Sequence, residues 1–106
     1  MRLGRILLGR YNAGMKTKEG KELIKVFMEA GKSETLMEAF LEDILTPAEL
    51  EEVVQRWQIV KMLAKGERQH AIAKKLGIGV GTVTRGSKEL KDKNGGFTQV
   101  LKKFKF

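Results

Sequence analysis

The stretch QHAIAKKLGIGVGTVTRGSKELK, residues 69–91, decides the fold of this chain. Two short helical patterns flank a turn that contains Gly77 and Gly79. Ala73 is small where two helices must cross closely, and Gly77 suits a turn residue with positive φ. The apolar residues that would form a small core between the two helices are Ile72, Leu76, Ile78 and Val83. The pattern predicts a helix-turn-helix, whose second helix enters the DNA major groove. An ordinary αα-hairpin in a core is the alternative.

Helical patterns extend on both sides of this stretch. One helix is predicted from Lys18 to Gly31, and a second follows a capping Ser33. A third begins at Thr46-Pro47, a favourable helix start, and ends near Gly66. Within the stretch, helices are expected over about 69–76 and 80–91, and a short last helix after the turn at 94–96. No segment resembles a strand, so the sequence predicts an all-α chain with six helices.

The N-terminal residues 1–16 are basic, with three glycines and no acidic residue. Their apolar stretch Ile6–Leu8 is too short for a secretory signal. We expect a flexible basic arm, followed by a helical domain over residues 17–106. A true start at Met15, with residues 1–14 as a mis-assigned extension, is the alternative.

Composition excludes several classes of protein. The chain has 106 residues, no cysteine and one histidine, His70, which argues against disulfides, thiol catalysis and histidine-rich metal sites. No apolar run approaches the roughly 20 residues that span a bilayer. No Ser/His/Asp set, metal cluster or Walker-type loop is visible, so we expect no enzyme, no metal and no cofactor. A cysteine-free chain without a membrane segment suits the cytoplasm.

The charge is uneven along the chain. The net charge is +8, made of +5 over residues 1–32, −7 over residues 33–55 and +10 over residues 56–106. A basic half that contains a helix-turn-helix favours a polyanionic partner, double-stranded DNA. A solvated mixed surface, or an acidic module over residues 33–55 that binds another protein, are the alternatives.

Two long apolar stripes, within residues 36–44 and 50–64, exceed what a chain of this length can cover. The stripes therefore favour a helical homodimer.

The second helix of the motif has a gap in its apolar stripe. The stripe should continue from Val83 to positions 86 and 87, which are Gly86 and Ser87. The gap fits close packing against another helix, or a slot for a flat apolar ligand. Arg85, beside the gap, offers a fork suited to a carboxylate.

Several strings in the chain closely resemble the tryptophan repressor family over roughly residues 36–104. They are Leu45-Thr46-Pro47, Arg56, Ile59-Val60, Leu63, Gly66, Leu76-Gly77 and Thr82-Val83-Thr84-Arg85-Gly86-Ser87. The resemblance implies an intertwined homodimer that binds operator DNA when L-tryptophan fills pockets at the dimer interface.

The resemblance also assigns roles in a ligand site. Arg85 would face the ligand carboxylate, Arg56 would stack on the indole, and Gly86 would make room for it. Leu45 and Thr46 would approach the ligand from the partner chain. Glu89 stands where the best-known members carry a small hydroxyl residue, so it would either repel the carboxylate or pair with the ammonium group.

The DNA-contacting residues are expected around the start of the motif's second helix. Val80, Gly81, Thr82 and Thr84 are candidates for base or water-bridged contacts, and Gln69 and His70 for bases or phosphates. The candidates for phosphate contacts are Lys74, Lys75, Lys88 and Lys91. The sequence thus predicts a DNA-binding transcriptional repressor with L-tryptophan as corepressor. A DNA-binding regulator of the same fold with another effector, or none, is the alternative.

Overall fold

The structure is a computed structural model that describes residues 14–104. Within these residues the chain is all-helical, and its six helices confirm the predicted fold class. The chain divides into two units, residues 1–46 and residues 47–106. Most of the predicted N-terminal arm lies outside the described residues, and residues 14–16 precede the first helix as a turn.

The N-terminal unit contains α2 (Lys18–Ala30) and α3 (Glu34–Ile44). The Thr17 hydroxyl caps α2 by accepting a hydrogen bond from Gly20 N at 3.0 Å. Ser33 caps α3 as predicted and accepts from Leu36 N at 3.2 Å. Phe27 of α2 and Phe40 of α3 meet edge to face, with ring centroids 5.1 Å apart. An edge-to-face aromatic pair thus joins the two helices of this unit.

Much apolar surface on α3 and on the first half of α4 has no cover within its own unit. Leu36 and Ile44 on α3 are 49% and 42% exposed, and Val53 and Val54 on α4 are 47% and 54% exposed. These residues belong to the two stripes from which the sequence predicts a dimer.

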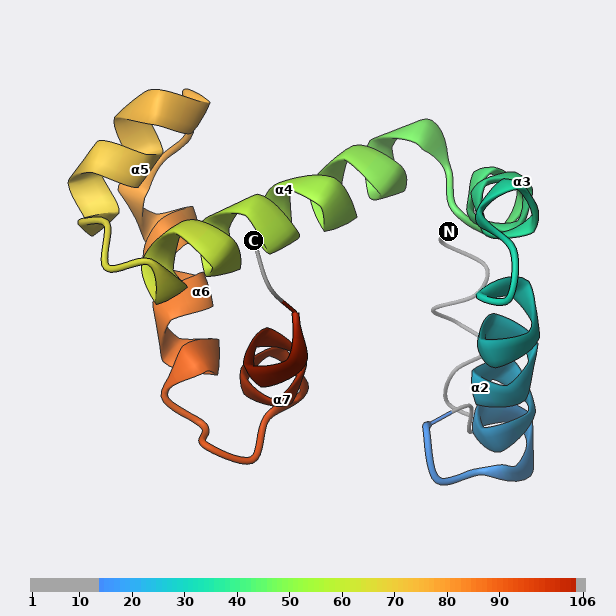
Figure 1. The fold of residues 1–106 in the computed structure, drawn as a ribbon. Helices are drawn as coiled ribbons and strands as arrows, with labels where there is room; N and C mark the ends of the chain where they lie inside the picture. Colours follow the sequence, from blue (N-terminus) through green and yellow to red (C-terminus); the bar gives the residue numbers. More distant parts are fainter. Residues whose placement is uncertain (1–13, 105–106) are drawn as a thin grey trace. The chain divides into compact units, whose positions relative to one another are not determined.

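The second unit holds α4 (Pro47–Ala64), α5 (Gln69–Leu76), α6 (Val80–Leu90) and α7 (Gly96–Lys103). Figure 1 shows α5 and α6 beside the C-terminal half of α4, with α7 next to α4 and α6. The core of this unit is formed by Ile59, Ile72, Ala73 and Val83, with Met62, Leu63, Leu76 and Ile78 packed against it. Because three of these four core residues come from the predicted helix-turn-helix, the motif is anchored on α4. No helix among residues 14–104 is long and apolar enough to cross a bilayer.

Candidate nucleic-acid interface and adjoining cleft

A left-handed glycine joins the two helices of the motif. Gly77 has φ +67° and ψ +38°, a backbone conformation that L side chains rarely adopt. Its N–H, as the cap of α5, donates to Ala73 O and Lys74 O, and Ile78 N donates to Ala73 O at 3.0 Å. The chain then enters α6, and Val83 and Ile72 become fully buried. The predicted helix-turn-helix is confirmed, including the positive φ at Gly77.

A hydrogen bond between side chains connects α5 to α6. The Thr84 hydroxyl lies 2.6 Å from Gln69 Oε1 and 3.0 Å from Val80 O. Both side chains are partly buried. Two residues predicted to contact DNA therefore also hold the motif together. No hydroxyl caps α5, because Arg68 stands at the N-cap without a side-chain hydrogen bond.

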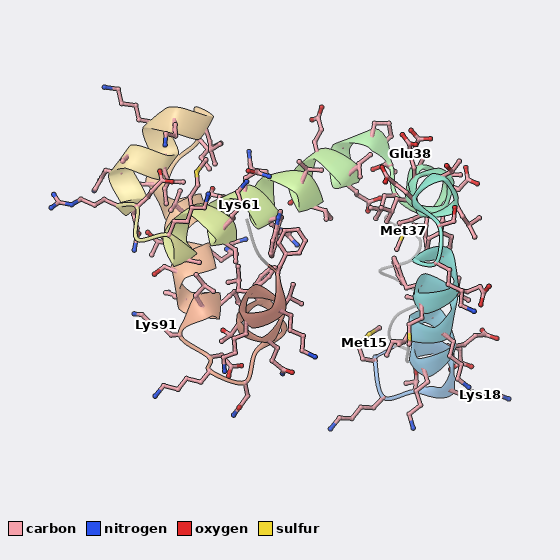
Figure 2. All side chains as sticks on the ribbon, in the orientation of Figure 1. Met15, Lys18, Met37, Glu38, Lys61 and Lys91 are labelled. Atoms are coloured by element: carbon pink, nitrogen blue, oxygen red, sulfur yellow. The ribbon has the colours of Figure 1, made fainter. Side chains whose placement is uncertain are left out.

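The other residues predicted to contact DNA are exposed. They are His70, Lys74, Val80, Gly81, Thr82, Lys88 and Lys91. Figure 2 shows the Lys91 side chain extending outward at the C-terminal end of α6. Lys75 is also exposed, with its Nζ 2.9 Å from the carboxylate of Glu67. The motif thus presents a small, exposed first turn of α6, with exposed lysines in the last turn of α5 and at the C-terminal end of α6.

A cleft of about 550 Å³ adjoins this surface, on the side of α6 that faces α4. Its lining residues are Glu52, Gln55, Arg56, Ile59 and Val60 of α4, Thr82, Arg85, Gly86 and Glu89 of α6, and Phe97 of α7. Four of the six residues predicted to bind ligand, those at positions 56, 85, 86 and 89, are brought together here. Leu45 and Thr46 belong to the N-terminal unit and do not line the cleft.

The charged residues of the cleft differ in their pairing. Arg56 Nη2 lies 3.3 Å from Glu52 Oε1, one turn earlier on α4. Arg85 takes part in none of the ion pairs found among residues 14–104. Glu89 follows Arg85 by one turn on α6 and lines the same cleft. The cleft therefore offers one unpaired guanidinium together with a nearby carboxylate.

Gly86 lies where α6 packs closely against side chains of α4. A Cβ at this position would lie 2.9 Å from Ile59 Cγ2 and 3.6 Å from Leu63 Cδ1. Of the two interpretations of the gap in the apolar stripe, close helix packing is the one that the geometry supports directly. Gly86 also lines the cleft, so the close approach and the ligand slot are not exclusive.

Several lining residues were not among the sequence candidates for ligand binding: Glu52, Gln55, Ile59, Val60 and Phe97. Glu52, Ile59 and Val60 lie one turn from Arg56 on α4, so the 3.6-residue period from Arg56 was a usable signal for these three. Thr82, predicted to contact DNA, also borders the cleft. Among residues 14–104, no group of three acidic, cysteine or histidine side chains could hold a metal ion.

Comparisons with known proteins find one family. A family model described as Trp repressor protein matches residues 18–105. A Trp operon repressor homolog of Vibrio vulnificus is 50% identical over 52 residues, which cover 48% of this chain and 51% of that protein. Homologs of the same description from Vibrio parahaemolyticus and Xylella fastidiosa are 39% and 34% identical, over 69% and 68% of this chain and 68% and 78% of their own lengths. The chain thus spans about half the length of the first of these relatives and more of the other two. No solved structure matches the chain.

Proposed function

The chain belongs to the Trp repressor family, and from this premise we propose that it is a homodimeric transcriptional repressor that binds operator DNA with L-tryptophan as corepressor. We also propose that the protein acts in the cytoplasm and that it catalyses no reaction. The observation that carries the proposal is the exposed first turn of α6 on a helix-turn-helix with a buried core.

The shape and charge of the motif support the proposed DNA binding. The N-terminal turn of α6 is narrow, because Gly81 and Thr82 are small, and it is exposed to solvent. A helix presented in this way enters the major groove with its first residues against base edges. Lys74 at the end of α5, and Lys88 and Lys91 at the C-terminal end of α6, are exposed and would neutralise phosphates.

A homodimer would cover the apolar side chains that each unit leaves exposed on α3 and on the first half of α4. A dimer would also present two copies of α6 to two half-sites of an operator. By the family resemblance, Leu45 and Thr46 of a second copy would complete the ligand site.

The cleft suits an aromatic amino acid. Its volume of about 550 Å³ falls within the range of sites for small ligands. The unpaired guanidinium of Arg85 suits a carboxylate, because the two groups can form two parallel hydrogen bonds. A ligand between α4 and α6 would fix the angle between these two helices. It would thereby favour the orientation of α6 that fits the DNA major groove. Ligand and DNA would then raise one another's affinity by the same factor.

A mobility-shift assay tests the proposal. The protein is used first to select an operator from a random duplex pool, with and without L-tryptophan. Affinity for the selected duplex is then measured at zero and saturating L-tryptophan. We expect affinity to rise about 5–150-fold, the usual range for coupled sites. Intact DNA binding with equal affinities would refute the corepressor while retaining the repressor.

A second candidate is a regulator of the same fold with another effector or none. The observation that favours it is the pair of carboxylates in the cleft, Glu52 and Glu89. Glu52 already engages Arg56, and Glu89 lies one turn from Arg85 on α6, so these groups would compete with a ligand carboxylate. Calorimetry with L-tryptophan separates the two candidates.

A further inference from the structure

The apolar surface of the cleft depends on one side chain. Besides Gly86, its apolar lining residues are Ile59, Val60 and Phe97. Ile59 and Val60 are only 2% and 1% exposed, so little of either can touch a ligand. Phe97 is half-buried and is therefore the apolar lining side chain with accessible surface.

A hydrogen-bonded turn places Phe97 at this position. Asp92, between α6 and α7, accepts from Asn94 N at 3.0 Å through its side chain, and from Gly95 N at 3.1 Å and the Thr98 hydroxyl at 2.9 Å through its backbone carbonyl. A Cβ on Gly95 would lie 3.2 Å from Asp92 O, so the backbone of Gly95 passes close to the Asp92 carbonyl. These bonds define where α7 begins, and Phe97 is its second residue.

The far end of α7 is held by a separate contact. The ring of Phe104 meets Trp57 of α4 edge to face, with centroids 5.7 Å apart and planes at 75°. Phe104 does not line the cleft. The aromatic residue at the C-cap of α7, Phe104, thus packs against Trp57, whereas Phe97 within α7 borders the cleft.

We infer that Phe97 is a specificity-determining residue, whose ring contacts the aromatic ring of the bound amino acid and makes the cleft prefer aromatic over aliphatic ligands. The inference rests on the proposed ligand site and names the element that selects the ligand's side chain. Aromatic rings attract one another in edge-to-face or offset geometries at centroid distances of about 4.5–7 Å. Arg85 would serve the carboxylate, which every amino acid carries, so it does not distinguish one side chain from another. Arg56, which by the family resemblance would stack on the indole, adds a cation at the face of the ring, and Phe97 adds the contact with a second aromatic ring.

Calorimetry with L-tryptophan on Phe97→Ala and on the control Val100→Ala tests this inference, because Val100 lies on α7, is 49% exposed and does not line the cleft. We expect Phe97→Ala to weaken binding about tenfold or more, and Val100→Ala to stay within about twofold of the unaltered protein. Equal weakening by both variants would mean that the effect comes from altering α7 and not from the ring of Phe97, and would overturn the inference. Unchanged binding by Phe97→Ala would overturn it too, while the proposed corepressor would stand.

Phe97→Leu and Phe97→Tyr keep the test decisive if the alanine variant does not fold. Phe97→Leu retains apolar volume without a ring, so we expect it to reduce the preference for L-tryptophan over L-leucine at least about threefold. Phe97→Tyr retains the ring and should preserve the preference. An unchanged preference in Phe97→Leu would overturn the inference. Absence of L-tryptophan binding by the unaltered protein would overturn both the inference and the proposed corepressor.

Discussion

The Thr84 hydroxyl and the Gln69 side-chain carbonyl lie 2.6 Å apart and join the two helices of the helix-turn-helix. Because the carbonyl of the Gln69 amide faces α6, its NH₂ group is left to donate elsewhere. The bond therefore orients a donor near the surface that we propose binds DNA, before any DNA is bound. Pre-organisation of this kind reduces the entropy lost on binding.

Thr84→Val should weaken both the motif and its DNA complex. The variant keeps the shape of the side chain but leaves Gln69 without its partner, so unfolding free energy should fall by about 0.5–1.5 kcal/mol. A double-mutant cycle with Gln69→Ala, followed by urea denaturation at one protein concentration, measures the coupling. Strictly additive effects would show that the bond contributes nothing to stability.

Gly86→Ala should destabilise the protein, although alanine is the better helix former. The added methyl group would lie 2.9 Å from Ile59 Cγ2, and Ile59 is buried and stiff at χ1. Overpacking of this kind costs about 1–3 kcal/mol, which exceeds the roughly 1 kcal/mol gained in helix propensity. Gly81→Ala on the same helix is the control, because a Cβ there meets nothing within 4 Å. We expect that control to be neutral or slightly stabilising in urea denaturation.

Arg85→Ala should abolish the response to ligand while DNA binding without ligand persists. The variant removes the unpaired guanidinium of the cleft, so a bound carboxylate would lack its partner. The measurement is the ratio of operator affinities at saturating and zero L-tryptophan. Arg68→Ala is the control, since Arg68 is exposed and does not line the cleft. A ratio unchanged by Arg85→Ala would remove Arg85 from the site.

DNA binding should weaken steeply with salt. With about six to ten phosphate contacts per dimer, the slope of log affinity against log salt should be about −5 to −9. Lys91→Ala should make the slope shallower and weaken specific and random duplexes about equally. Lys32→Ala is the matched control, because Lys32 lies in the N-terminal unit and pairs with Glu29 at 3.0 Å. A slope near zero would exclude the phosphate contacts.

Sedimentation should give about twice the chain mass of 11.9 kDa at micromolar concentration. Val54→Asp should shift the protein toward monomer and lower its stability, because a charge would replace an apolar side chain that is 54% exposed in the single chain. A stable, folded monomer of the unaltered protein would contradict both the dimer and a ligand site completed by a second copy.

Local signals in the chain predicted the helices closely. Ser33 caps α3, Gly77 ends α5 with positive φ, and both act through atoms only a few residues away. The helix predicted over 80–91 ends one residue earlier, at Leu90. Gly96, which was predicted to belong to the turn over 94–96, is the first residue of α7. Such differences are confined to helix ends, where local preferences are weakest.

The sequence by itself determined the helices, the helix-turn-helix core and the gathering of positive charge around it, because helical periodicity and capping depend on neighbours along the chain. Only the tertiary structure decided the role of Gly86, the bond from Thr84 to Gln69, and the position of Phe97 in the cleft. Gly86 packs against Ile59, which lies on another helix and 27 residues earlier in the sequence. Phe97 reaches the cleft only because the turn before α7 sets where that helix begins. Contacts of this kind depend on how helices cross, and crossing geometry is set by the packing of whole faces rather than by any local pattern.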